Sequence, residues 1–457
     1  MKNIKNILQL FTGFTLFFLI AIVFSGCFKM ENRYTKVAPG RWRAVLKLVD
    51  NPISPNPEGK PLPEKMNMQF DEVTLGELPF NFDIVYDDET KFHLEIINGE
   101  ERINVTDITF GRGKERAMDS IRINFPLFET YITAWVDGNL MEGYYYVPAK
   151  GNYKIPFVAT HGKAHRFTPL AKKPVINLTG KWETTFGLSE GEDPYPAIGE
   201  FNMDGNRLTG TFRTETGDYR YLEGTVQANK MYLSCFDGSH AFLFEGKIRE
   251  DSTIIGSFRS GKHYRTIWEA EKNDEVELVS PDSLTYLKEG YKSIEFAFEN
   301  PQGKMISLEN PAYQNKVKIV QILGTWCPNC RDETTFLIDY LKKNNHPDLE
   351  VIALAFEKYK EKEKADNAIN IYKKHFDMPY EMVYAGYYDK KEAAKSLPML
   401  NHILSYPTMI FLDRNNQVRR IHTGFEGPAT STFKGFSKDF DKFLKELLAE
   451  EPAEMTN

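Results

Sequence analysis

Short runs of alternating apolar and polar residues dominate the chain from about Arg41 to Glu271, among them WRAVLKLV, FHLEIING, RINVTDITF and MYLSCF. Glycine, asparagine and aspartate residues separate these runs. A period of two residues, cut at short intervals by turn residues, is typical of antiparallel sheets or small barrels. We therefore predict a β-rich region that contains no helix of ordinary length.

A weak internal repeat divides this β-rich region. The segment GRWRAVLKL begins at Gly40, and the similar segment GKWETTFGL begins at Gly180. Similarity of this kind predicts two related β units, each an antiparallel sandwich or a barrel-like sheet, which we place at residues 38–172 and 176–273. The intervening TPLAKKPVINLTG has two prolines and no periodicity, as expected of a linker.

The pattern changes after Lys272, where predicted strands begin to alternate with predicted helices. VKIVQIL, LEVIALAF, YPTMIFLD and VRRIHTG have the composition of strands, whereas PNCRDETTFLIDYLKKN and EKADNAINIYKKHF have helical spacing. A closing helix covers about Thr432 to Ala449. This order predicts a C-terminal α/β domain at residues 285–450, with a mixed sheet and helices on both faces.

The N-terminus has the layout of an export signal. Lys2 and Lys5 precede a long apolar stretch, and Ser25, Gly26 and Cys27 follow it. Small residues before a cysteine resemble the lipobox of bacterial lipoproteins, which implies a signal peptide over residues 1–27 and acylation of Cys27. An uncleaved membrane anchor or an ordinary secretory signal are the alternatives, and all three lead out of the cytoplasm.

Composition narrows the class of protein further. A length of 457 residues predicts two to four domains, and 41% hydrophobic residues exclude a largely disordered chain. The net charge is −7, with no cluster of lysine and arginine, so we expect no nucleic-acid partner. Four cysteines are too few for a disulfide framework in an exported chain. Cys235, within MYLSCF, is expected to be a buried, inert thiol.

The sequence GTWCPNCRDE places Cys327 and Cys330 between a predicted strand and a predicted helix. The first turn of a helix presents unpaired N–H groups and the positive end of the helix dipole, which favour a thiolate. We therefore expect Cys327 to be the nucleophile. Cys330, one turn later, can attack a mixed disulfide on Cys327, and Pro328 suits the first helical position.

Two other interpretations of this pair are weaker. A structural zinc site needs four ligands, and the sequence offers no second pair of cysteines. The nearest histidine couple, His161 and His165 in HGKAH, falls in the β-rich region. A structural disulfide across two residues would be strained and easily reduced. We expect no metal and no cofactor.

A second segment, LSYPTMIFL, places Pro407 at the entry of a buried strand. Proline is normally excluded there unless it lies at an edge, at a bulge or in a cis turn. An ordinary turn proline is the alternative.

Residues from about 290 to 450 resemble TlpA/ResA-type thiol-disulfide oxidoreductases, which have the thioredoxin fold. The resemblance rests on VKIVQILGTWCPNCRDE, SYPTMIFLD and Gly424, which occur in the family order. It implies a cis-proline beside the reactive cysteine and a substrate site that includes Trp326, Tyr406, Pro407 and Thr408. The β-rich region looks like the extensions that precede such domains in Bacteroidetes-type lipoproteins.

Members of that family are tethered to a membrane outside the cytoplasm and mostly reduce disulfides, often in cytochrome c maturation. The resemblance therefore implies two kinds of partner, disulfide-containing protein substrates and a membrane thiol-disulfide partner that recycles the cysteines. It also implies a location in the cell envelope, on the periplasmic side of a membrane.

The chain departs from the family six residues before Cys327, where thioredoxin has a buried aspartate and this chain has Gln321. An acidic residue at the end of the next strand often replaces it in the family, and Glu357 occupies that position. A partly buried Glu357 could accept the proton of Cys330. The alternative is a solvated residue at the start of a Lys- and Glu-rich segment.

The leading hypothesis is a membrane-anchored, extracytoplasmic oxidoreductase that exchanges its Cys327–Cys330 dithiol with disulfides of other proteins, most often as a reductase. One alternative is an envelope lipoprotein whose β units bind a ligand or partner. The other is a peroxiredoxin-like peroxidase, against which the closely spaced pair of cysteines argues.

Overall fold

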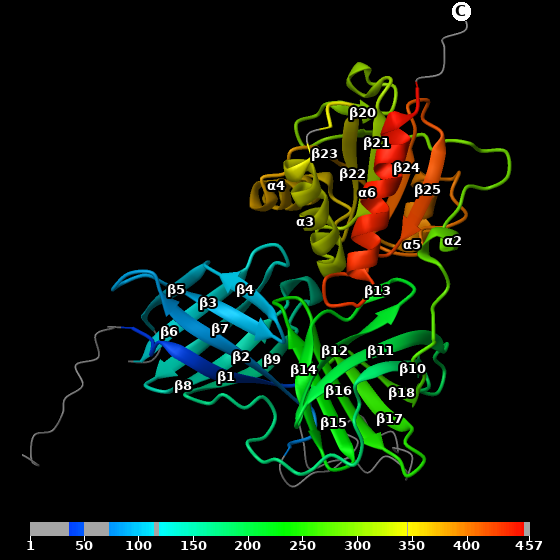
Figure 1. Ribbon diagram of the computed structural model, residues 1–457. Coiled ribbons are helices and arrows are strands. Elements are labelled where there is room, and N and C mark those ends of the chain that lie inside the picture. Colours follow the sequence, from blue (N-terminus) through cyan, green and yellow to red (C-terminus); the bar gives the residue numbers. More distant parts are fainter. Residues whose placement is uncertain (1–35, 50–72, 114–117, 345, 452–457) are drawn as a thin grey trace, which may run out of the picture.

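The computed structural model describes residues 36–49, 73–113, 118–344 and 346–451, which form two large β sheets and a C-terminal α/β domain (Figure 1). The predicted signal peptide and Cys27 lie outside the described residues. In Figure 1 the α/β domain lies above the second sheet, and the first sheet extends to one side. This arrangement places the C-terminal domain in contact with the β-rich region.

The first sheet has nine antiparallel strands in the order β4-β3-β2-β1-β9-β8-β7-β6-β5. The alternation of apolar and polar residues produces it, because every second side chain faces the core. Its strands are β1 Gly40–Lys47, β2 Glu77–Tyr86, β3 Phe92–Asn98, β4 Glu101–Val105, β5 Ile108–Arg112, β6 Asp119–Phe125, β7 Thr130–Asp137, β8 Leu140–Tyr146 and β9 Lys154–His161.

The second sheet closes on itself as a barrel, because β11 pairs with β12 as well as with β10. Closure removes the free edges that an open sheet exposes. Its strands are β10 Gly180–Phe186, β11 Tyr195–Asp204, β12 Arg207–Thr214, β13 Gly217–Asp218, β14 Leu222–Gln227, β15 Lys230–Phe236, β16 Ala241–Ile248, β17 Ile254–Ser260 and β18 Tyr264–Lys272. Among the described residues of both sheets, the helical structure is one turn, η2 Pro148–Lys150.

The repeated Gly-X-Trp segments begin both sheets in the same way. The indole Nε1 of Trp42 donates to the carbonyl of Ala38 at 2.9 Å, and that of Trp182 donates to the carbonyl of Leu178 at 2.8 Å. Both rings are buried. A buried indole needs a partner for its N–H, and in each case the residue four positions earlier supplies it.

The two sheets share part of their core. Phe236 of β15 in the barrel packs on Phe80 of the first sheet, with ring centroids 4.5 Å apart. The hydroxyl of Ser234 donates to the carbonyl of Pro79 at 2.6 Å, in a buried position. The first sheet therefore completes its core with side chains that the barrel supplies.

The C-terminal domain contains a five-stranded sheet in the order β23-β22-β21-β24-β25. β21, β22 and β23 are parallel, whereas β24 and β25 are antiparallel to their neighbours. The elements are β21 Val317–Leu323, α3 Pro328–Lys343, β22 Leu349–Glu357, α4 Lys362–Phe376, β23 Glu381–Tyr387, α5 Lys390–Ser396, β24 Thr408–Leu412, β25 Val418–Thr423 and α6 Phe433–Ala449. A short helix, α2 Pro281–Leu284, a turn, η3 Pro311–Tyr313, and a hairpin of β19 Ala297–Glu299 and β20 Met305–Ser307 precede them. The fold is thioredoxin-like.

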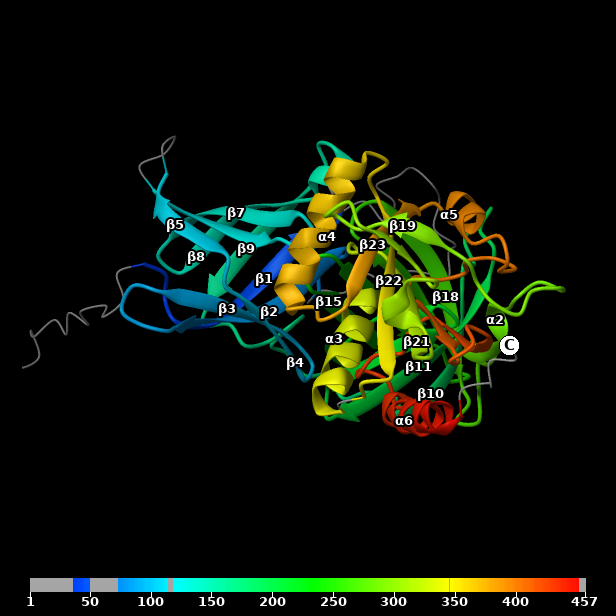
Figure 2. The ribbon, with the colours of Figure 1, turned by 90° about the horizontal axis from the view of Figure 1, so that it is seen from above.

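Helices α3, α4 and α6 lie together along the sheet in both ribbon views, and α5 lies apart from them (Figures 1 and 2). Phe336 of α3 packs on Phe440 of α6, with ring centroids 5.0 Å apart. Tyr372 of α4 donates to the hydroxyl of Thr334 of α3 at 2.9 Å. Strand β23 and helix α5 were not among the predicted elements, because EMVYAGY has a glycine and too few consecutive apolar residues to indicate a strand.

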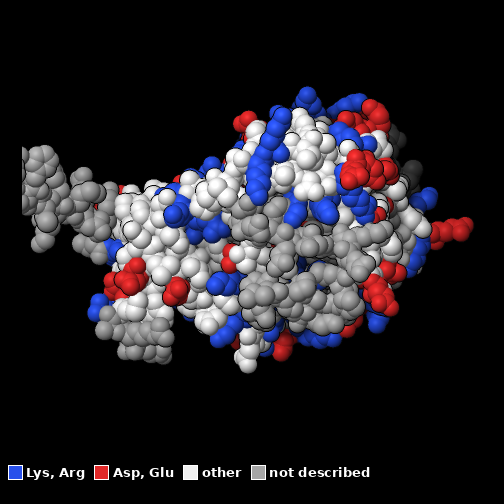
Figure 3. All heavy atoms as spheres, turned by 90° about the horizontal axis from the view of Figure 1, so that it is seen from below, with Lys and Arg blue, Asp and Glu red and all other residues white. Residues whose placement is uncertain are grey.

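The surface that faces downward in Figure 1 has lysine, arginine, aspartate and glutamate side chains interspersed (Figure 3). Along the part of the chain that the structure describes, none of the helices has the length and apolar character needed to cross a bilayer.

Candidate active site

The two cysteines lie where β21 leads into α3. The connecting residues and the first helical turn, residues 324–330, are called the cysteine turn below. Cys327 is the N-cap of α3, and Pro328 is the first helical residue. The backbone N–H of Cys330 donates a hydrogen bond to Sγ of Cys327 at 3.3 Å. An acceptor at the N-cap bonds one of the backbone N–H groups that have no partner within the first helical turn. Proline suits the following position because it has no backbone N–H. Sγ of Cys327 therefore sits at the positive end of the helix dipole.

Burial makes the two thiols different. The exposed fraction of Cys327 is 7%, whereas Cys330 is fully buried. Both are free thiols. Burial raises the pKa of the Cys330 thiol well above its ordinary value, and the hydrogen bond and charge of Cys327 raise it further. Cys330 therefore holds its proton behind Cys327, which is the cysteine that a substrate can reach.

The predicted proline lies beside the nucleophile. The peptide bond between Tyr406 and Pro407 is cis, and the carbonyl of Tyr406 accepts a hydrogen bond from the Cys327 thiol at 3.4 Å. Register explains this proximity, because Thr408 begins β24 and pairs with Ile322 near the end of β21. The loop that ends at the proline is thus held against the cysteine turn.

The residues expected at the substrate site differ in exposure. The Trp326 ring packs edge-on against Tyr406, with centroids 5.7 Å apart, and its Nε1 donates to the carbonyl of Phe356 at 3.0 Å. Thr408 is buried, and its hydroxyl donates to the carbonyl of Ser405 at 2.9 Å. The structure therefore brings Trp326, Tyr406 and Pro407 to the cysteine turn, while the side chain of Thr408 faces the interior.

Glu357 ends β22 as expected and is fully buried, so the alternative of a solvated residue is wrong. Its carboxylate accepts from the backbone N–H of Thr325 at 3.0 Å and from the hydroxyl of Thr325 at 2.8 Å. Burial raises the pKa of Glu357 to about 7, although the two bonds from Thr325 oppose the change. Glu357 thus holds the cysteine turn two residues before Cys327.

Sequence reasoning missed a second buried carboxyl group, that of Glu333 on α3. Oε2 of Glu333 accepts from the side-chain amide of Gln321 at 2.8 Å. Its Oε1 is buried and has no hydrogen-bond partner among the residues that the structure describes. Burial raises the pKa of Glu333 well above its ordinary value, and the charge of Cys327 adds to this effect. The charge of Glu333 in turn raises the pKa of Cys330.

A signal for Glu333 was present in the sequence. Residues three and four apart on a helix share a face, so a buried Cys330 places Glu333 and Thr334 on the buried face of α3. Gln321, which stands where thioredoxin has an acid, is a buried amide that needs partners. A carboxylate at helical spacing from Cys330 supplies one of them.

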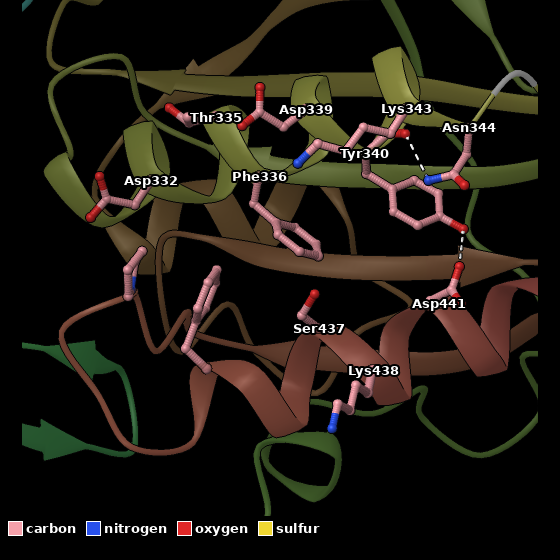
Figure 4. Close-up of a pocket in the computed structure, with 12 residues that line it drawn as sticks. Asp332, Thr335, Phe336, Asp339, Tyr340, Lys343, Asn344, Ser437, Lys438 and Asp441 are labelled. Carbon is pink, nitrogen blue, oxygen red and sulfur yellow. Dashed lines mark hydrogen bonds between the residues drawn. The ribbon is translucent and has the colours of Figure 1, made fainter.

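A cavity of about 620 Å³ opens beside the cysteine turn, and Trp326, Cys327 and Asn329 line one side of it. Another cavity, of about 590 Å³, lies between α3 and α6, where Tyr340 donates to Asp441 at 3.1 Å (Figure 4). Neither cysteine lines this second cavity. The first cavity is therefore the one from which a molecule can reach Cys327.

The remaining candidates lie elsewhere. Nε2 of His161 contacts the carbonyl of Pro39 at 2.9 Å, and its ring packs on Trp42. No group of three or more potential metal ligands occurs in the described parts of the chain. Cys235 is fully buried in β15, and burial raises its pKa well above the ordinary value.

Comparison with protein families finds one match, to the AhpC/TSA family, over residues 290–421. The matched segment is less than a third of the chain and includes the cysteine turn and Pro407. Comparison with curated proteins finds no match.

Among solved structures, a thiol:disulfide interchange protein of the thioredoxin family from Chlorobium tepidum is 20% identical, with a TM-score of 0.27 over 35% of this chain and 96% of its own. A secreted thiol-disulfide isomerase from Corynebacterium glutamicum is 19% identical, with a TM-score of 0.28, and the match covers 38% of this chain and 98% of the other. A thiol-disulfide oxidoreductase from Bacteroides fragilis is 19% identical, with a TM-score of 0.25, and the match covers 33% of this chain and 99% of the other. At these scores the likeness does not bear on activity.

The strand order, the position of the cysteine turn and the family match agree on one conclusion. Residues 290–421, which match the AhpC/TSA family model, lie within a thioredoxin-like domain that follows a β-rich region.

Proposed function

We propose that the protein is a membrane-anchored, extracytoplasmic thiol-disulfide oxidoreductase of the TlpA/ResA kind that reduces disulfides in other proteins. The observation that carries the proposal is the asymmetry of the two thiols. Cys327 caps α3 and borders a cavity, whereas Cys330 is buried behind it with a raised pKa. A dithiol arranged in this way has one sulfur for attack and one for resolution.

In the first step, the Cys327 thiolate attacks one sulfur of a substrate disulfide. A bond forms between Cys327 and that sulfur, the substrate S–S bond breaks, and the second substrate sulfur leaves as a thiolate that takes up a proton. The N–H of Cys330 and the helix dipole favour negative charge on Cys327 before the attack.

In the second step, Cys330 loses its proton and attacks Sγ of Cys327. The mixed disulfide breaks, and the substrate sulfur that was bonded to Cys327 leaves as a thiolate and takes up a proton. The two cysteines end as a disulfide, and the substrate ends as a dithiol. Glu333 is suited to accept the proton of Cys330, because its Oε1 is unpaired and its charge interacts with that of Cys330. Glu357, whose oxygens are both engaged by Thr325, is suited to hold the turn and is the second candidate for the proton.

The cellular setting of the proposal rests on the sequence. The export signal and Cys27 support a lipid anchor in the cell envelope. Repeated turnover requires a membrane thiol-disulfide partner that returns electrons to Cys327 and Cys330. Replacement of Cys27 by serine, followed by mass spectrometry of the mature N-terminus, tests the anchor. An unmodified N-terminus in the wild-type protein would remove that part of the proposal.

The activity is tested by insulin reduction with dithiothreitol as electron donor. Cys327→Ser should abolish the catalysed rate, and Cys330→Ser should accumulate a mixed disulfide with insulin that mass spectrometry detects. Cys235→Ser is the matched control, because that thiol is buried in the barrel. Full activity of Cys327→Ser would overturn the mechanism.

Peroxide reduction is a second candidate, which the match to the AhpC/TSA family favours. In a peroxiredoxin-like peroxidase, a threonine would lie close to the reactive cysteine. Here the hydroxyl of Thr325 donates to Glu357 instead. Consumption of hydrogen peroxide that is fast in the wild type and absent in Cys327→Ser would favour this candidate over disulfide reduction.

A further inference from the structure

The barrel contacts the cysteine turn directly. The side-chain amide of Asn329, which lies between the two cysteines, donates to the carbonyl of Asp218 at 3.3 Å. The hydroxyl of Ser405, next to the cis-proline loop, donates to the carbonyl of Thr216 at 2.9 Å. A side chain at Gly217 would collide with Asn329, because a Cβ there would lie 2.3 Å from its amide nitrogen. The turn that leads into β13, residues 214–218, is therefore fitted against the reactive site.

Buried charges hold this contact in place. Arg220 of the barrel is 2% exposed, and its guanidinium pairs with Asp332 of α3, with Glu101 of the first sheet at 2.5 Å and with Asp237 at 3.1 Å. The carboxylate of Asp218 accepts from the backbone N–H of Gly427 at 2.6 Å. A buried arginine shared among three carboxylates ties the first sheet, the barrel and α3 into one arrangement.

The cavity beside Cys327 is formed by both parts of the chain. Tyr195, Tyr219, His240 and Phe242 of the barrel line it together with Trp326 and Cys327. Most of these side chains carry aromatic rings. The cavity also has two carboxylates, Glu215, which is partly exposed, and Asp218, which is buried and accepts from backbone N–H groups. Aromatic walls favour an apolar or aromatic side chain in the ligand.

His240 supplies a polar group on the barrel side. Its Nδ1 lies 3.1 Å from Oδ2 of Asp237, and its ring stacks on Phe242 with centroids 4.2 Å apart. Asp237 is buried; burial alone would raise its pKa, but the charge of His240 and its hydrogen bonds outweigh burial and lower it. An oriented imidazole whose Nε2 has no hydrogen bond in the described parts of the chain can bond a ligand's main chain.

We propose that this cavity is the substrate-binding cleft, and that it selects a disulfide-bonded cysteine carried on an extended polypeptide segment with an aromatic or aliphatic residue beside it. The proposal rests on the proposed disulfide reduction. A volume of about 620 Å³ suits a short segment, whereas the surface of a folded domain does not enter it. Because Cys327 keeps 7% of its exposure, only a segment inside the cleft meets its sulfur.

The test uses the full chain and three substrates. Two are disulfide-bonded peptides that differ in the residue beside cysteine, phenylalanine in one and aspartate in the other. The third, bis(2-hydroxyethyl) disulfide, reports the chemistry of the cysteines alone. The wild type should reduce the phenylalanine peptide with a kcat/KM about tenfold above that of the aspartate peptide, the difference expected from contact with aromatic walls.

Two variants test the barrel wall. Tyr219→Ala and His240→Ala should each raise KM for the phenylalanine peptide several-fold, a larger effect than either has on the rate with bis(2-hydroxyethyl) disulfide. Tyr291→Ala is the matched control, because Tyr291 is 50% exposed and does not line the cleft. Tyr219 also packs on aromatic residues of the barrel, so Tyr219→Ala could fail to fold. In that case His240→Ala alone tests the cleft, because the His240 side chain is 24% exposed in the wild type.

The outcomes separate this proposal from the proposed function. If the wild type reduces all three substrates but shows no preference, or if His240→Ala leaves every KM unchanged, the cleft is not the selective site. If the wild type reduces none of the three, the proposed disulfide reduction itself is wrong.

Discussion

Glu357 makes the stability of the C-terminal domain depend on pH. Burial raises the pKa of this carboxyl from 4.5 to about 7 in the folded chain. Below the unfolded value the group is protonated in both states, so it does not oppose folding. As pH rises from about 4.5 to about 7, the unfolded chain loses this proton while the folded chain keeps it, so stability falls by about 3 kcal/mol and levels off above pH 7. Glu357→Gln removes that charge while its amide oxygen can still accept from Thr325.

The variant should therefore be more stable than the wild type at about pH 8.5 and similar to it at about pH 4. A difference of about 3 kcal/mol moves a urea midpoint by about 1 to 2 M. Hydrogen–deuterium exchange of peptides from β21 and β22, followed through a urea titration with reduced thiols, reports this domain separately from the barrel. Exchange rates are corrected for pH.

Glu350→Gln is the matched control, because Glu350 lies on the same strand but is partly exposed and paired with Lys316 at 2.5 Å. Its midpoints should follow those of the wild type at both values of pH. If the urea midpoints of Glu357→Gln change with pH in parallel with those of the wild type, burial does not raise the pKa of Glu357 and the reasoning is refuted.

Three further predictions concern the thiols and the domain contact. Glu333→Gln should slow the release of the substrate from the mixed disulfide at least about tenfold in stopped-flow measurements at neutral pH, because the proton acceptor for Cys330 is lost. The first attack by Cys327 should keep its rate. Equal slowing of both steps would count against a proton transfer to Glu333. Iodoacetamide should label Cys327 in the native protein but label Cys330 and Cys235 only in urea, because the last two are fully buried; labelling of Cys330 before unfolding, seen by peptide mass spectrometry, would contradict this. Arg220→Met should lower the free energy of unfolding by about 3 to 5 kcal/mol, since the buried Asp237 and the partly buried Asp332 lose this guanidinium. Arg207→Met should lower it by less than about 1 kcal/mol, because Arg207 is half exposed and its partner Glu223 keeps Arg166. Urea denaturation distinguishes these outcomes, and equal effects of the two substitutions would refute the assignment.

Local patterns predicted the elements that carry the cysteines. The apolar run VKIVQIL and the helical spacing after Cys330 indicated β21 and α3, and Pro407 indicated a special turn before β24. These features depend on neighbours in the sequence, where periodicity and residue preference act.

Contacts between distant segments were not predictable in that way. The carboxylate of Glu333 takes on its role because α3 lies over Gln321, and the fit of Asn329 to Asp218 requires the barrel to be in place. Helical spacing from Cys330 indicates that Glu333 faces the interior but does not identify its partner, and the contact of Asn329 leaves no period in the sequence. The sharing of a core between the two sheets was hidden for the same reason, because Phe236 has the pattern of an ordinary barrel residue.

That shared core sets an order for biosynthesis. Ser234 and Pro79, which join the two sheets, are 155 residues apart in the chain. At roughly 5 to 20 residues per second, the ribosome needs roughly eight to thirty seconds to make the second segment after the first. The N-terminal sheet cannot complete its interior during that time. A nascent chain of this protein therefore exposes apolar strands until the barrel has been made, and we expect it to depend on holding chaperones until then.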